Sequence, residues 1–186
     1  VSYTPTDAWT IAGSMESGRV RDAVSGDFDR TAFSFGAAYA PSEDLSLRAR
    51  LEYGTEDGAG TDQDRETYGL SIGYANQVND DWRMLMDIEA LYSDAADGAF
   101  HDGEYARASL GYAYRPLDNE KLNVLLRYTW LNDQPGEDQV SANGNDEGPL
   151  QRSHVLALAA SYDLNPAFTL GAKLAYRQSQ VADRGT

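Results

Sequence analysis

The sequence offers few side chains that could carry out catalysis. Its two histidines are His101 and His154, and His154 directly follows Ser153. A serine and a histidine can act as nucleophile and general base only when their side chains meet. Residues around His154 alternate between apolar and polar types, as in a strand, and successive side chains of a strand point to opposite faces. We therefore expect no Ser153–His154 pair, and the sequence places no serine or second acid beside His101 and the adjacent Asp102.

Clusters of acidic residues are the next candidates for chemistry, because calcium is bound by carboxylate oxygens. The three clusters are Glu56, Asp57, Asp62 and Asp64; Asp94, Asp97, Asp102 and Glu104; and Glu137, Asp138, Asp146 and Glu147. None of them has the residue spacing of an EF-hand calcium loop. We interpret them as solvated surface loops, and we expect neither a metal site nor a cofactor.

Composition excludes several classes of function. The 186 residues include 15 Lys and Arg against 30 Asp and Glu, and the net charge of −15 has the wrong sign for binding a nucleic acid. The absence of cysteine excludes disulfides and thiolate metal sites. No run of about 18 apolar residues is present, so no transmembrane helix is expected. The length is that of a single domain over residues 1–186.

Apolar and polar residues alternate with a period of two through almost the whole chain. Between Leu45 and Tyr53, every second residue is apolar, and the residues between them are Ser, Arg, Arg and Glu. Such a segment forms a strand with one apolar face and one charged face. The pattern predicts about nine strands, at 8–20, 29–40, 45–55, 66–76, 82–93, 104–115, 122–131, 152–163 and 167–178.

The predicted connections alternate in length. Short ones, rich in Pro, Asn and Asp, lie at 41–44, 77–81, 116–121 and 164–166, and long ones lie at 21–29, 56–65, 94–103 and 132–151. Antiparallel strands joined in this way place the short turns at one edge of a sheet and the long connections at the other. Because the first connection is long, the first strand is predicted to run away from the short-turn edge.

Aromatic residues are predicted to occupy both ends of the apolar face. Near the short turns lie Trp9, Tyr39, Tyr74, Trp82, Tyr112, Tyr114, Tyr162 and Phe168, and near the long connections lie Tyr53, Tyr68, Tyr92, Tyr128, Trp130 and Tyr176. Tyr and Trp favour membrane interfaces, because each has an apolar body and a polar tip. Two aromatic belts around an aliphatic band favour a membrane-spanning sheet over the alternative, a soluble β-sandwich or lipocalin-like barrel.

The chain resembles Gram-negative outer-membrane β-barrel proteins, either porin-like or the C-terminal barrel of a larger surface protein. Residues 157–163 (Ala-Leu-Ala-Ala-Ser-Tyr-Asp) and 170–176 (Leu-Gly-Ala-Lys-Leu-Ala-Tyr) carry this resemblance. It implies an all-β, antiparallel up-and-down transmembrane β-barrel of about 10–14 strands, incomplete at the C-terminus of this sequence. It also implies a location in the bacterial outer membrane, with the N-terminus periplasmic and the long loops extracellular.

The resemblance further implies outer-membrane lipid and lipopolysaccharide as partners. The acidic loops are expected to be simply solvated. In a less specific alternative, divalent cations bridge their carboxylates to lipopolysaccharide phosphates. Because the predicted strand count is odd and an open sheet edge is costly in lipid, missing strands or an additional domain of the same or another chain are also expected.

The polar face of the strands would line the interior of such a barrel. Its charged residues are Arg30, Arg48, Arg50, Glu52, Arg83, Asp87, Glu89, Arg107, Arg115, Arg127, Lys173 and Arg177. In one interpretation they form a polar lumen whose arginines select anionic solutes. In the other, arginine–carboxylate pairs plug a narrow barrel.

Functions of different classes remain open at this point. The first is a passive pore or structural element of the outer membrane, and the alternative is a membrane anchor or translocator barrel for a larger surface or secreted protein. A hydrolase acting at the barrel rim is a third hypothesis, which lacks a placed serine–histidine pair. The chain is therefore not predicted to be an enzyme.

Overall fold

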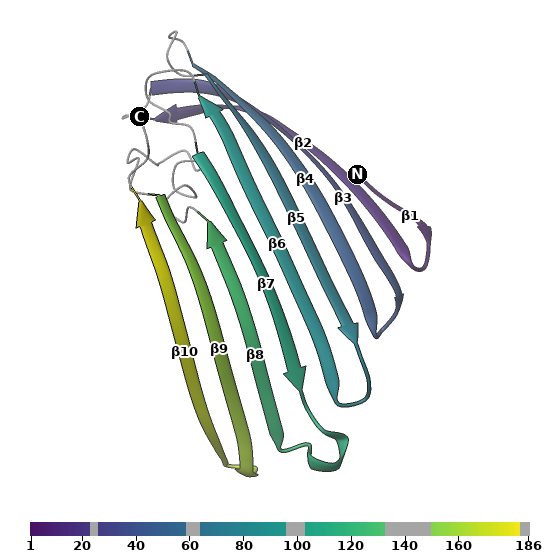
Figure 1. Ribbon diagram of the computed structural model, residues 1–186. Coiled ribbons are helices and arrows are strands. Elements are labelled where there is room, and N and C mark those ends of the chain that lie inside the picture. Colours follow the sequence, from purple (N-terminus) through teal and green to yellow (C-terminus); the bar gives the residue numbers. More distant parts are fainter. Residues whose placement is uncertain (23–25, 59–63, 96–102, 133–149, 183–186) are drawn as a thin grey trace.

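The computed structural model describes residues 1–22, 26–58, 64–95, 103–132 and 150–182 (Figure 1). Its elements are β1 (Ser2–Thr6), β2 (Trp9–Asp22), β3 (Gly26–Ser42), β4 (Leu45–Gly58), β5 (Arg65–Gln77), β6 (Trp82–Ala95), β7 (Gly103–Tyr114), the 3-10 helix η1 (Leu117–Asn119), β8 (Leu122–Asn132), β9 (Leu150–Asn165) and β10 (Phe168–Ala182). Among the described residues, no helix is long and apolar enough to cross a membrane.

All ten strands form one antiparallel sheet in which each strand pairs with its neighbours in the chain. The sheet is strongly curved, and the turns within the described ranges lie together at one edge, the lower edge in Figure 1. We call this the short-turn edge and the opposite one the long-connection edge. Within the described residues, β1 and β10 are the two outer strands and do not pair with each other. The all-β, up-and-down architecture predicted from the alternation is confirmed.

Short polar side chains close the turns at the short-turn edge. The backbone N–H of Asp44 donates to Ser42 Oγ at 3.3 Å. Asn79 Oδ1 accepts the N–H groups of Asp81 and Trp82, each at 3.0 Å. These side-chain bonds replace backbone bonds that a tight turn cannot make, which is why Ser and Asn recur at this edge.

The register of the strand pairs divides the side chains between two faces. One row of paired residues runs Met15, Phe33, Tyr53, Tyr68 and Tyr92 from β2 to β6. We call the face that carries this row the apolar face and the opposite one the polar face. Every predicted aromatic residue lies on the apolar face, as the period of two requires.

The apolar face has no cover in the described part of the protein. Leu51 is 56% exposed and Leu174 is 70% exposed, although both lie in the middle of long strands. Among the described residues only two apolar side chains are buried, Phe28 and Tyr105. A soluble sandwich or lipocalin-like barrel would bury these strands' apolar side chains in a core. The described sheet forms no such core on its apolar face.

The prediction of nine strands missed β1. Its residues Ser2–Thr6 are too few to show a periodic pattern and include Pro5, yet they pair with β2, with Ser2 opposite Ala12 and Tyr3 opposite Ile11. The predicted first strand, at 8–20, corresponds to β2 and runs away from the short-turn edge as predicted, but β1 precedes it and runs towards that edge. Val1 lies part-way along β2, where its amino group donates to the carbonyl of Gly13 at 2.7 Å.

Several predicted loop residues belong to strands instead. Pairing of β2 with β3 continues to Asp22 and Gly26, so the connection predicted at 21–29 is reduced to residues 23–25. Likewise, Glu56 and Asp57 lie in β4, Asp94 lies in β6 and Glu104 lies in β7. Beyond the apolar band both faces of a strand are polar, so alternation disappears from the sequence while backbone pairing continues.

Candidate functional site: the polar face of the sheet

The register places eleven of the twelve charged residues predicted for the interior on the polar face. They are Arg30 on β3; Arg48, Arg50 and Glu52 on β4; Arg83, Asp87 and Glu89 on β6; Arg107 on β7; Arg127 on β8; and Lys173 and Arg177 on β10. Arg115 directly follows β7, and its backbone N–H donates to the carbonyl of Asp81 at 2.8 Å. The polar face therefore carries charged side chains on β3, β4, β6, β7, β8 and β10.

Ion pairs cover the polar face between β4 and β7. Arg107 Nη2 lies 2.8 Å from Glu89 Oε2 on the neighbouring strand. Arg50 Nη2 lies 2.5 Å from Glu52 Oε1 on the same strand. These pairs are partly exposed, so each contributes little to stability, and their main effect is to neutralise charge on this part of the face.

A glycine lets one of these pairs span three strands. Arg48 on β4 lies in one register row with Gly73 on β5 and Asp87 on β6. Because Gly73 has no side chain, Arg48 lies across it, and its Nη2 reaches Asp87 Oδ1 at 3.6 Å. A Cβ atom at Gly73 would overlap Arg48 Nε and lie 3.0 Å from its Cγ.

Replacing Gly73 with valine should abolish the coupling between Arg48 and Asp87. In the parent protein, a double-mutant cycle of Arg48→Gln and Asp87→Asn should give a coupling energy of up to about 1 kcal/mol, because both side chains are exposed. In a Gly73→Val background we expect the coupling to vanish, because the branched side chain occupies the path of the guanidinium. Gly111→Val is the control, since the nearest atom to its Cβ is 3.7 Å away. Retention of the coupling in the Gly73→Val protein would contradict this account.

A second cluster at the long-connection edge is buried. Arg65 at the start of β5 is 4% exposed, and its Nε donates to Glu56 Oε2 at 2.7 Å. Arg30 Nε lies 3.9 Å from the other oxygen of Glu56. Buried Phe28 and Tyr105 lie on the same face in nearby register rows. We call Arg30, Glu56 and Arg65 the buried ion triad.

Sequence reasoning missed two members of this triad. Glu56 was assigned to a solvated loop cluster, and Arg65 was not among the predicted interior residues. The period of two along β4 could have placed Glu56 on the polar face. Glu56 is an even number of residues from Arg48, Arg50 and Glu52 and so shares their face. Its partner Arg65 follows only from the pairing of β4 with β5.

Ser153 and His154 lie on opposite faces, as predicted. Ser153 is fully buried on the polar face, where its hydroxyl accepts from Arg177 Nη2 at 3.0 Å and lies 2.9 Å from Ser179 Oγ. His154 lies on the apolar face, with its Nδ1 2.7 Å from the Tyr128 hydroxyl. The two side chains cannot act together, and His101 lies outside the described residues.

Most of the three predicted acidic clusters lies outside the described residues. Of their members, Glu56, Asp57, Asp64, Asp94 and Glu104 are described. Among the residues that the structure places, no group of three or more histidine or carboxylate side chains could hold a metal ion.

Aromatic side chains contact one another on the apolar face near both edges. Close to the short turns, the ring centroids of Trp9 and Tyr39 are 4.7 Å apart and those of Trp82 and Tyr114 are 4.6 Å apart. Close to the long-connection edge, Tyr68 lies 5.1 Å from Tyr53 and 6.2 Å from Tyr92. Such pairs favour a boundary between polar and apolar surroundings, because the rings pack together while the polar groups of the side chains remain in contact with water.

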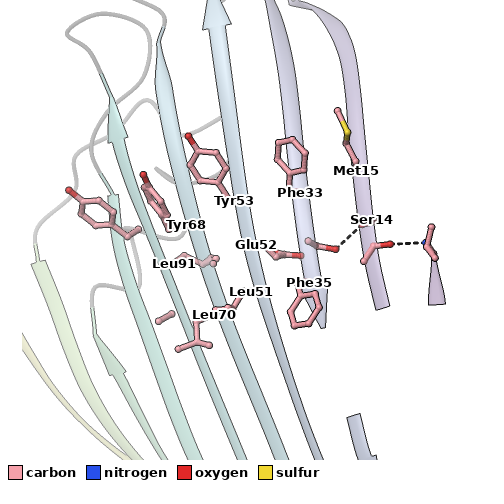
Figure 2. A pocket seen from close by; sticks show the side chains of 16 residues that line it. Ser14, Met15, Phe33, Phe35, Leu51, Glu52, Tyr53, Tyr68, Leu70 and Leu91 are labelled. Carbon is pink, nitrogen blue, oxygen red and sulfur yellow. Dashed lines mark hydrogen bonds between the residues drawn. The ribbon is translucent and has the colours of Figure 1, made fainter. Parts of the chain in front are cut away.

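Between these aromatic groups the apolar face is hollowed. Figure 2 shows Met15, Phe33, Tyr53 and Tyr68 on successive strands, with Phe35, Leu51 and Leu70 in the row nearer the short-turn edge. The hollow has a volume of about 1100 Å³ and is lined mainly by side chains of β2 to β6. Its lining carries no cluster of charges, so it belongs to the apolar surface and not to the charged site.

Comparison with protein families matches residues 1–181 to the family described as Gram-negative porin. The chain belongs to the Gram-negative porin family. It is accordingly an outer-membrane β-barrel protein. The described sheet supplies ten strands of this architecture and is not itself closed.

Comparison with solved structures matches the Pseudomonas aeruginosa protein OccD3 (OpdP), with 11% sequence identity and a TM-score of 0.43. The match covers 98% of this chain and 62% of that chain, so this porin-family chain spans less than two thirds of the length of that structure. Comparison with curated proteins finds no match.

Proposed function

We propose that the protein forms a passive diffusion pore in the outer membrane, with the polar face lining the water-filled interior. The observation that carries this proposal is the division of one sheet between an exposed apolar face and an opposite face that carries charged side chains. Only a barrel in lipid gives both faces a suitable solvent, namely hydrocarbon outside and water inside. Membership in a porin family favours a channel over an enzyme.

The proposal includes an orientation. Outer-membrane barrels have short periplasmic turns and longer extracellular loops. The short-turn edge would then face the periplasm, and the long-connection edge would face the outside of the cell. In this frame the aromatic pairs Trp9–Tyr39 and Tyr53–Tyr68 lie at the inner and outer lipid interfaces, where lipid and lipopolysaccharide are the expected partners.

Conductance in a planar bilayer tests the pore directly. The folded full-length protein, inserted from detergent, should give steady steps of ohmic current. The alternative, a membrane anchor or translocator barrel, is favoured by the ion pairs that cover β4 to β7 and could help to fill a narrow interior. A protein that inserts into vesicles and resists extraction, yet passes no current, would refute the pore and support the anchor.

A further inference from the structure

We propose that the hollow on the apolar face binds a lipid whose headgroup carries an ammonium group, with an acyl chain in the hollow and the ammonium group at Glu66. The site combines the apolar lining of the hollow with a carboxylate at its rim. This inference rests on the proposed function in one respect, because the apolar face has to lie against lipid. It adds the class of lipid that the outer surface of the barrel recognises.

The hollow provides the apolar half of the site. Its volume of about 1100 Å³ exceeds the range of about 300–1,000 Å³ that is usual for sites of drug-sized ligands. Phe35, Leu51 and Leu70 lie side by side in it, and Phe35 and Leu51 are each 56% exposed. In a bilayer, an acyl chain gains van der Waals contact with such side chains, but hydrocarbon alone does not distinguish one lipid from another. The selection has to come from the headgroup.

The rim of the hollow on the side of the long-connection edge carries Glu66. This residue lies near the start of β5, two residues before Tyr68 and therefore on the same face. Tyr68 donates its hydroxyl to Glu66 Oε2 at 2.7 Å, and Tyr53 donates to Oε1 at 3.3 Å. Figure 2 shows both tyrosines with their hydroxyls directed away from Leu51 and Leu70. The tyrosines that line the hollow thus connect its apolar lining to a carboxylate.

The carboxylate of Glu66 keeps both its charge and some of its acceptor positions for a ligand. A carboxylate has about four lone-pair positions, and the two tyrosine hydroxyls occupy one on each oxygen. Glu66 is exposed, and it forms no ion pair with any described residue. Arg65, its neighbour in the chain, lies on the polar face and binds Glu56 there. The neutral hydroxyls therefore orient the Glu66 carboxylate without cancelling its charge.

The charged groups around Glu66 also favour a cation. Asp94 lies in the same register row as Glu66, on the neighbouring strand β6. The other carboxylates on this side of β3 to β7, among the described residues, are Asp27, Asp29, Asp57 and Glu104. In the same part of the sheet, the side-chain cations on this side are Arg19 and Arg21, and each lies opposite an aspartate. At the β2 end of the hollow, the amino group of Val1 donates to the carbonyl of Gly13. The surroundings of Glu66 are therefore negative, and they disfavour an anionic headgroup.

Three tyrosine rings beside Glu66 suit an ammonium group in particular. Tyr53, Tyr68 and Tyr92 lie in one row on β4, β5 and β6, with successive ring centroids 5.1 and 6.2 Å apart. An ammonium group within about 6 Å of such a ring is attracted to its face. Its N–H groups can at the same time donate charge-assisted hydrogen bonds to the carboxylate. On β8, by contrast, the hydroxyl of Tyr128 lies 2.7 Å from His154 and has no carboxylate partner among the described residues.

The test is lipid binding by the folded full-length protein in detergent, measured by native mass spectrometry. The probes are phosphatidylethanolamine, which carries an ammonium group, and phosphatidylglycerol with the same acyl chains. The parent protein should bind phosphatidylethanolamine about tenfold more tightly, because a cation–π contact and an ion pair add up at one group. Glu66→Gln keeps the shape of the side chain but removes its charge, and it should bring the two affinities together. The matched control is Asp118→Asn, which removes the same charge at the short-turn edge and should keep the preference.

A soluble amine presents the same ammonium group without an acyl chain. An excess of ethanolamine should leave the bound phosphatidylethanolamine in place, because the hollow holds the acyl chain. Displacement by ethanolamine, equal binding of the two lipids by the parent protein, or an unchanged preference in Glu66→Gln would each overturn the lipid site. Loss of the preference in Asp118→Asn as well would assign it to net charge and would also overturn the site.

The planar-bilayer measurement separates this inference from the proposed pore. A protein that conducts but binds both lipids equally retains the pore and loses the lipid site. A protein that binds phosphatidylethanolamine through Glu66 but passes no current refutes the pore and retains the lipid site. A protein that does not insert into lipid at all overturns both.

Discussion

Arginine in place of Leu126 is expected to destabilise the folded protein by about 2–4 kcal/mol in lipid vesicles. Leu126 lies on the apolar face of β8, in one register row with Tyr112, Leu158 and Leu174. It is 44% exposed, so in a membrane its side chain contacts hydrocarbon. An arginine at this depth must either lose its hydration or bend towards an interface, and both outcomes cost free energy.

The control is the neighbouring residue on the other face. Leu125→Arg lies one residue away on the polar face, in the row of Arg83 and Lys173. We expect it to cost less than about 1 kcal/mol, as for substitutions away from packed sites. Equilibrium unfolding by urea from vesicles, followed by tryptophan fluorescence, measures both variants. A larger cost for Leu125→Arg than for Leu126→Arg would show that the two faces are assigned the wrong way round.

Removal of the charge of Glu56 is the second substitution with a large expected effect. Glu56 is 6% exposed and interacts with Arg65 and Arg30, and Arg65 itself is 4% exposed. In Glu56→Gln, both guanidinium groups lose this carboxylate while Arg65 stays buried. Breaking a buried pair from one side typically costs about 3–5 kcal/mol, so we expect a loss of about 3 kcal/mol in the same urea experiment.

An exposed ion pair on the same face provides the comparison. Asp87→Asn removes the carboxylate that pairs with Arg48, and both of these side chains remain in contact with water. The loss should be below about 1 kcal/mol, because solvent screens the remaining charge. Equal costs for Glu56→Gln and Asp87→Asn would mean that the buried ion triad is hydrated in the membrane and contributes no more than a surface pair.

Amide exchange should distinguish the two ends of the sheet in the same proteins. In Glu56→Gln we expect faster exchange at the long-connection ends of β4 and β5, where Glu56 and Arg65 are paired across the strands. Protection near Leu47 and Tyr74, close to the short turns, should be unaffected, because local opening spreads only within a cooperative unit.

The extent of several strands could not be predicted from local pattern alone. Hydrophobic alternation detected Leu45 to Tyr53 because one face of that segment meets an apolar solvent. It did not detect Ser2–Thr6, which is only five residues long, or the extension of β4 to Gly58, where polar residues occupy both faces. In these segments backbone pairing with a neighbouring strand maintains the structure. This pairing cannot be predicted from the residues of one segment alone, because it depends on the neighbouring strand.

By itself, the sequence determined which side chains share a face. A strand has a strict period of two, so the opposite placement of Ser153 and His154, the common face of the aromatic residues and the shared side of Arg48 and Arg50 all follow from position alone. Only the tertiary structure decided which charges meet. The register between strands brought Arg48 across Gly73 to Asp87, buried Glu56 between Arg30 and Arg65, and left Arg127 and Lys173 without a described carboxylate partner. Those contacts depend on how far each strand is shifted along the next, which is a property of pairs of strands and not of any one segment.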